Sequence, residues 1–173
     1  MKTILKSDFE CIYSINGRII EGGIVNLEEN KVYYITVFPL NATYLSYTIK
    51  MVGDKIYTNK DLCVKVTTKE ETYILFCKRY PYVYATTPFS YEGGCVCEFF
   101  TLIKQNRIDK ARSLLSDNLS KSVSDDALKG FFEKYEYVLD TDDDNKWILA
   151  TQNGEGEYFT FILKHGLIDD ISN

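Results

Sequence analysis

The stretch "YEGGCVCEFFTLIKQNRIDKARSLL", residues 91–115, marks a change in the periodicity of the chain. Before it, apolar residues alternate with a period of two. After it, they recur with the spacing of a helix, so the stretch is predicted to join two kinds of structure. Its cysteines, Cys95 and Cys97, are interpreted as small apolar residues at a helix start. A structural zinc site needs four ligands, usually with wider spacing, so no metal or cofactor is expected.

The part before this joint is predicted to be built from strands. "DFECIYSI", residues 8–15, largely alternates, and Asn16-Gly17 behind it favours a tight hairpin turn. "KVYYITVF", residues 31–38, is β-branched and aromatic throughout, so burial on both faces is expected. Six or seven strands separated by turn signals predict an all-β sandwich or barrel over residues 1–90.

The part after the joint is predicted to be an α+β domain over residues 95–173, with residues 91–94 as the hinge. Apolar residues spaced by three or four positions predict three helices, the second after a break at Asn106 and the third after Ser124. Four short strands follow. The fold class expected for this domain is therefore three helices packed on a short antiparallel sheet.

Charge and cysteine content limit the classes of function. Residues 1–94 contain 11 Lys/Arg and 10 Asp/Glu, and residues 95–173 contain 9 and 15, so the net charges are +1 and −6. An acidic second part disfavours binding to a phosphate backbone there. The five cysteines are odd in number and irregularly spaced, so reduced thiols are expected. The N-terminus lacks the apolar core of a signal peptide, so a cytoplasmic location without membrane attachment is expected.

Residues 95–172 resemble the NTF2-like superfamily of cystatin-type α+β folds, closest to its small bacterial members. The resemblance rests on an aromatic pair opening the first helix, an "A-x-x-LL" segment, a second aromatic pair and a final "G-x-I-x-x-I". These positions are Phe99, Phe100, Ala111, Leu114, Leu115, Phe131, Phe132, Gly166, Ile168 and Ile171. It implies a curved sheet around a conical cleft, made shallow here by short strands.

The resemblance implies a ligand cleft lined by aromatic side chains in the second domain. The predicted cleft residues are Phe100, Phe132, Tyr135, Trp147, Phe159 and Phe161. Enzymes of the superfamily place Asp, His or Tyr in the cleft, whereas the single histidine, His165, is expected in a hairpin outside it. Residues 8–77 show a weaker resemblance to PEGA-like β-sandwich domains, which are commonly surface or scaffold elements.

Two further segments have a possible functional and a structural interpretation. Asp140, Asp142 and Asp144 have the spacing that opens a calcium loop, but Asn145 and Thr151 replace its glycine and bidentate glutamate. An acidic hairpin tip is therefore expected. "CKRYPYVY", residues 77–84, interleaves basic and aromatic residues as a single-stranded nucleic-acid site would, but a domain charge of +1 disfavours that function.

No catalytic motif is present, although residues far apart in sequence can still form an active site. The expected function is a non-enzymatic binding or protein-interaction module, monomeric or homodimeric, that holds a small apolar ligand or a protein partner. The alternative is a small NTF2-like enzyme, an isomerase or hydrolase acting on an apolar substrate. The discriminating feature is a deep cleft, as opposed to a solid core, in the second domain.

Overall fold

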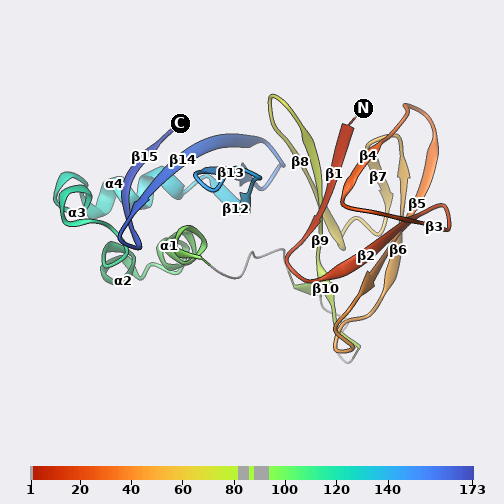
Figure 1. Ribbon diagram of the computed structural model, residues 1–173, viewed down its shortest axis with the longest axis horizontal. Helices are drawn as coiled ribbons and strands as arrows, with labels where there is room; N and C mark the ends of the chain where they lie inside the picture. Colours follow the sequence, from red (N-terminus) through yellow and green to blue (C-terminus); the bar gives the residue numbers. More distant parts are fainter. Residues whose placement is uncertain (1, 82–85, 88–93) are drawn as a thin grey trace. The chain divides into compact units, whose positions relative to one another are not determined.

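The computed structural model describes residues 2–81, 86–87 and 94–173 and divides the chain into two compact units, residues 1–89 and 90–173 (Figure 1). Of the described residues, 48% lie in strands and 18% in helices. Of the predicted hinge, residues 91–94, only Gly94 belongs to the described part.

The larger sheet of the first unit has five antiparallel strands in the order β3-β2-β5-β6-β7. Their bounds are β2 (Cys11–Ile15), β3 (Arg18–Ile20), β5 (Val32–Pro39), β6 (Tyr47–Val52) and β7 (Lys55–Thr58). The hairpin predicted at Asn16-Gly17 is confirmed: it joins β2 to β3, with φ of 50° and 83° at the two residues. Positive φ at both positions is what a two-residue type I′ turn requires.

The second sheet of the first unit has four strands in the order β4-β1-β9-β8. They are β1 (Lys2–Ser7), β4 (Ile24–Asn26), β8 (Cys63–Thr67) and β9 (Thr72–Phe76). Strand β1, which the sequence pattern did not predict, pairs in parallel with β9. Side chains from both sheets share one hydrophobic cluster, which includes Ile35, Ile49 and Phe76. A short ribbon of β10 (Lys78–Arg79) and β11 (Thr86–Thr87) follows.

The second unit begins with four helices and ends with an antiparallel meander β12-β13-β14-β15. The helices are α1 (Cys95–Lys104), α2 (Ile108–Arg112), α3 (Asp117–Ser122) and α4 (Asp125–Phe132). The strands are β12 (Tyr135–Asp140), β13 (Lys146–Thr151), β14 (Gly156–Lys164) and β15 (Leu167–Ser172). Local chemistry sets the helix ends: the side chains of Ser116 and Ser124 cap α3 and α4, and Asn106 takes a φ of 59° just beyond α1.

The fold class expected from the sequence is wrong. The described residues are mostly β, and the second unit has four helices and a sheet with strands of six, six, nine and six residues, in place of three helices on a short sheet. Helix α3 escaped the periodicity analysis because none of its residues is buried. A helix without an apolar face leaves no period to detect.

Candidate functional site

The six predicted cleft residues meet in the core of the second unit. Phe100, Phe132, Tyr135, Phe159 and Phe161 are buried in one hydrophobic cluster, and Trp147 is half-buried against it. They come from α1, α4, β12, β13 and β14. Phe159 and Phe161 lie two residues apart on β14, so strand alternation sends both side chains to the same face.

The aromatic rings of this cluster contact one another edge to face. The ring of Phe132 lies 5.6 Å from that of Phe99 and 5.8 Å from that of Phe100, centroid to centroid. The ring of Phe159 lies 5.7 Å from that of Tyr135. Such contacts are favourable by about 0.5–1.5 kcal/mol each beyond the burial of their area. The rings occupy the volume that a ligand in a central cleft would need, which favours the solid-core alternative.

Phe131, the first residue of the second aromatic pair, is 43% exposed. Neighbouring residues on a helix point about 100° apart, so Phe131 and Phe132 cannot both face the sheet fully. Phe131 instead lies at the edge of the cluster, with its ring 4.7 Å from that of Phe132 and 5.3 Å from that of Phe159.

A polar group of Tyr135, Glu157 and Lys134 lies at the margin of this core. The Tyr135 hydroxyl donates a hydrogen bond to Glu157, and the ammonium of Lys134 lies 3.4 Å from the same carboxylate. The pKa of Tyr135 is raised mainly by burial, and the hydrogen bond to Glu157 is the second cause. The phenol is therefore a hydrogen-bond donor rather than a base, and the edge contact with Phe159 covers its ring. This arrangement fits a structural role.

A surface depression of about 450 Å³ lies between the end of α1 and α4. Its lining is mixed in charge: Ile103, Lys104, Asn106, Asp126, Lys129, Gly130, Phe132 and Glu133. The ammonium of Lys104 is already engaged, 3.5 Å from the carboxylate of Glu136 and 3.4 Å from the carbonyl oxygen of Glu133. Two lysines and two acidic residues give this depression no preferred ligand charge.

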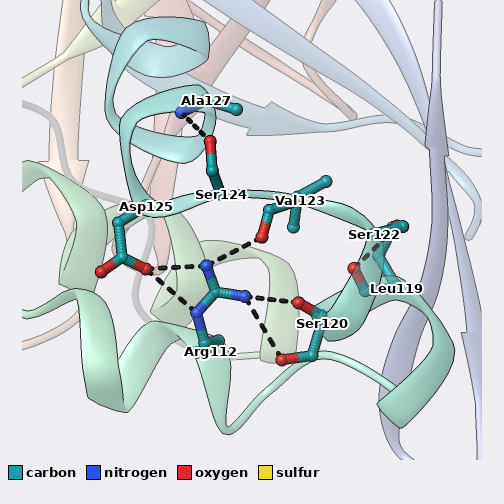
Figure 2. A network of polar contacts seen from close by, with 8 residues as sticks. All are labelled: Arg112, Leu119, Ser120, Ser122, Val123, Ser124, Asp125 and Ala127. Atoms are coloured by element: carbon teal, nitrogen blue, oxygen red, sulfur yellow. Dashed lines mark hydrogen bonds and ion pairs between the residues drawn. The ribbon is translucent and has the colours of Figure 1, made fainter.

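Arg112 joins three helices through a network of hydrogen bonds (Figure 2). From the end of α2, its guanidinium donates to the carboxylate of Asp125 at 2.7 Å and 3.1 Å, and to the carbonyl oxygens of Val123 at 2.9 Å and of Ser120. Ser120 lies in α3, Val123 follows the last residue of α3, and Asp125 opens α4. The planar fork of arginine suits several acceptors at once, so Arg112 fixes the α2–α4 segment rather than a substrate.

Replacing Arg112 with alanine should lower the free energy of unfolding by about 2–3 kcal/mol, because several charge-assisted hydrogen bonds are lost together. Arg112→Lys should recover little, since one ammonium cannot span the same acceptors. Urea unfolding followed by the fluorescence of Trp147, the single tryptophan, measures both. The control is Lys110→Ala, an exposed position on the same helix, and equal stabilities of the two alanine variants would contradict this role.

Burial also shapes the ionisation of several groups in the first unit. The Tyr47 hydroxyl donates to the carbonyl oxygen of Cys77 at 2.7 Å, and that of Tyr13 lies 2.8 Å from the hydroxyl of Ser7. Desolvation raises the pKa of both tyrosines well above their ordinary value, and it raises the pKa of Cys63 to about 12. These groups are unreactive near neutral pH.

The protein should lose stability in alkali. Unfolded tyrosine releases its proton near pH 10.0, and unfolded cysteine near pH 9.0, whereas the folded chain retains these protons. Each group then lowers the free energy of unfolding by about 1.4 kcal/mol per pH unit above its unfolded pKa. Urea unfolding at pH 8, 9, 10 and 11, followed by circular dichroism, should show this decline, with a shallower slope above pH 10 in Tyr47→Phe. Equal stability at pH 9 and pH 11 would contradict it.

The cysteine pair and the acidic run occupy structural positions. Cys97 is buried in the core of the second unit, and half-buried Cys95 opens α1. The pKa of Cys95 is raised mainly by burial and, to a smaller extent, by the charge of Glu98. All five cysteines are free thiols.

Asp142 and Asp144 are exposed in the β12–β13 turn, where the hydroxyl of Thr141 donates to the carbonyl of Lys146. Among the described residues, no group of three His, Cys, Asp or Glu side chains could hold a metal ion.

In the basic and aromatic segment, residues 77–84, Lys78 has a structural role because it forms a buried ion pair. Lys78 and Asp8 have side chains only 9% and 1% exposed, with ammonium and carboxylate 3.5 Å apart. Lys78 also lies over the ring of Tyr44, which contacts that of Tyr80. Tyr82 and Tyr84 lie outside the described residues. His165 is exposed in the β14–β15 turn with a φ of 53°.

The feature that the sequence analysis missed is the exposed face of the five-stranded sheet. Along β5, inward side chains such as Tyr33 and Ile35 are buried while Val32, Tyr34 and Phe38 are 42%, 49% and 42% exposed. The expectation that residues 31–38 would be buried on both faces is therefore wrong. Alternation alone could not show this, because both sets of side chains are apolar.

Neighbouring strands extend the same face. We use the name outer sheet face for the outward-facing apolar residues Ile12, Ile19, Val32, Tyr34, Phe38 and Tyr57 together with Lys50 and Lys55. The six apolar residues are among eleven large hydrophobic side chains exposed in the described chain, so more than half of them share one surface. In register, Ile12 lies opposite Phe38, and Tyr34 opposite Lys50. The ammonium of Lys50 lies 4.8 Å from the ring centre of Tyr57.

Comparison with known protein families, curated proteins and solved structures finds no match to this chain. The NTF2-like and PEGA-like resemblances therefore stay predictions. Within the described parts of the chain, no helix is long and apolar enough to cross a membrane.

Proposed function

We propose that the protein is a non-enzymatic interaction module that binds a protein partner through the outer sheet face. The observation that carries this proposal is the gathering of six exposed large hydrophobic side chains on one antiparallel sheet. An exposed face of such a sheet usually carries polar residues, as the row of Ser14, Thr36 and Thr48 does here, and the large apolar side chains on both sides of that row mark an interaction surface. A cytoplasmic location is part of this proposal.

The second unit supports the proposal through its packing. Phe99, Phe132, Phe159 and Phe161 are at most 2% exposed, and several of their rings contact one another directly. A small apolar ligand or an apolar substrate would need space where these rings lie. The ligand-binding and enzymatic alternatives are therefore less well supported. The resemblances to NTF2-like and PEGA-like domains agree with a binding role, since PEGA-like modules are commonly scaffold elements.

Affinity purification of the tagged full chain from the cells that make it tests the proposal. A co-purifying protein should be lost with Tyr34→Ser/Phe38→Ser, in which the removed side chains are 49% and 42% exposed. The matched control, Phe131→Ser/Leu163→Ser, removes side chains that are 43% and 42% exposed in the second unit and should retain it. Loss in the control alone, or a small-molecule adduct in the native mass spectrum, would favour a site in the second unit instead.

A further inference from the structure

We infer that the partner of the outer sheet face is an acidic polypeptide surface that places a carboxylate on Lys50. This inference rests on the function proposed above and adds the chemistry of the partner. Lys50 lies within the apolar face, opposite Tyr34 on β5 and against the ring of Tyr57. A partner that covers the tyrosines must also cover this ammonium.

Covering Lys50 requires a counter-charge from the partner. Lysine is depleted at interface centres because its ammonium is costly to desolvate without a paired carboxylate. Two charged residues occupy outward positions in the described strands of this sheet. They are Lys50 and Lys55, and both are basic. The face therefore has no carboxylate of its own to pair with Lys50, and the partner has to supply one.

The same charges and the size of the face disfavour a second copy as the occupant. Two such faces stacked on each other would bring four lysines and no strand carboxylate into one interface. Five strands are separated by four spacings of about 4.8 Å, and the seven residues 32–38 of β5 rise about 3.4 Å each, so the face measures roughly 460 Å². A stable interface needs about 800 Å² per partner, so two such faces alone are too small for a stable homodimer.

The aliphatic residues favour a polypeptide over a nucleic acid. Single-stranded nucleic acid binds by stacking its bases on aromatic rings along a basic groove. Here Ile12, Ile19 and Val32 share the face with the tyrosines, and aliphatic side chains offer no stacking surface. An acidic polypeptide with apolar side chains can pair its carboxylates with the lysines and pack its apolar side chains against the aliphatic residues.

Fluorescence anisotropy with three labelled polymers tests the inference on the full chain. The probes are a random copolymer of glutamate and tyrosine, a copolymer of lysine and tyrosine, and a deoxythymidine 20-mer. We expect binding of the first alone, weakened by salt and weakened at least about tenfold by Lys50→Glu, because a paired charge becomes a like-charge contact. The control Lys69→Glu, an exposed position in the β8–β9 turn of the other sheet, should bind as the unchanged chain does.

Several outcomes would overturn the inference. These are failure of the acidic copolymer to bind, equal binding by Lys50→Glu, preferential binding of the 20-mer, or a dimer in sedimentation that Tyr34→Ser dissociates. Lys50→Met, which keeps the stem of the side chain, guards against a folding defect and should weaken binding less than Lys50→Glu. If the partner is lost in Tyr34→Ser/Phe38→Ser while Lys50→Glu binds it normally, the proposed interaction function is supported and the inference of an acidic partner is wrong.

Discussion

Replacing Phe132 with alanine is expected to lower the free energy of unfolding by about 3–5 kcal/mol, because truncating a large aromatic leaves a cavity that neighbours fill only in part. Phe132 is 1% exposed, and its ring contacts those of Phe99, Phe100 and Phe131. Trp147, packed against the same cluster, reports the transition by fluorescence during urea unfolding.

Phe159→Ala and Phe131→Ala turn this measurement into a test of the solid core. Phe159 is 2% exposed, and its loss should cost as much as that of Phe132, whereas the loss at Phe131, 43% exposed, should be clearly smaller. A small loss at Phe159 beside a large one at Phe132 would indicate an open cleft over the sheet. It would shift the balance toward the ligand-binding or enzymatic alternative.

Replacing Lys78 with methionine should also cost about 3–5 kcal/mol, because the carboxylate of Asp8 then stays buried without this counter-charge. The two side chains are 9% and 1% exposed, whereas those of the surface pair Lys31 and Glu28 are 59% and 71% exposed. The measurement is urea unfolding followed by circular dichroism, which reports the strands of the first unit.

A double-mutant cycle isolates the pair. The double variant Asp8→Leu/Lys78→Met should lose less free energy of unfolding than the two single variants lose together. In the double variant, neither charge of this pair remains buried without the other. Additive losses, or a loss at Lys78→Met no larger than that of an exposed lysine such as Lys69→Met, would mean that the ion pair is not energetically coupled.

Local turn and cap chemistry could be predicted from the sequence, whereas long-range pairing could not. Asn16-Gly17 specifies its turn through positive φ at both residues, and Ser124 caps α4 as expected. Strand β1 was missed because its pairing, with Thr3 opposite Thr72, depends on residues far along the chain. Helix α3 is capped by Ser116 and accepts a hydrogen bond from Arg112 at Ser120, and no periodic pattern of apolar residues records these contacts.

The candidate site escaped prediction for a related reason. A strand such as β5, apolar on both sides, fits a sheet buried on two faces or one with an exposed apolar face. Only the arrangement of neighbouring strands decides between them. That the six predicted cleft residues meet could be expected, because helical spacing and strand alternation place them on shared faces. That they meet as contacting rings depends on packing between elements.

Site-specific photo-crosslinking inside the cells that make the protein tests the outer sheet face most directly. A benzophenone side chain is placed at Phe38, 42% exposed on that face, or at Phe131, 43% exposed on α4. The two positions match in residue type and exposure, so they differ mainly in the surface that they sample. We predict a discrete protein adduct from Phe38 and none from Phe131. An adduct from Phe131 with none from Phe38 would contradict the account and place the functional surface on the second unit.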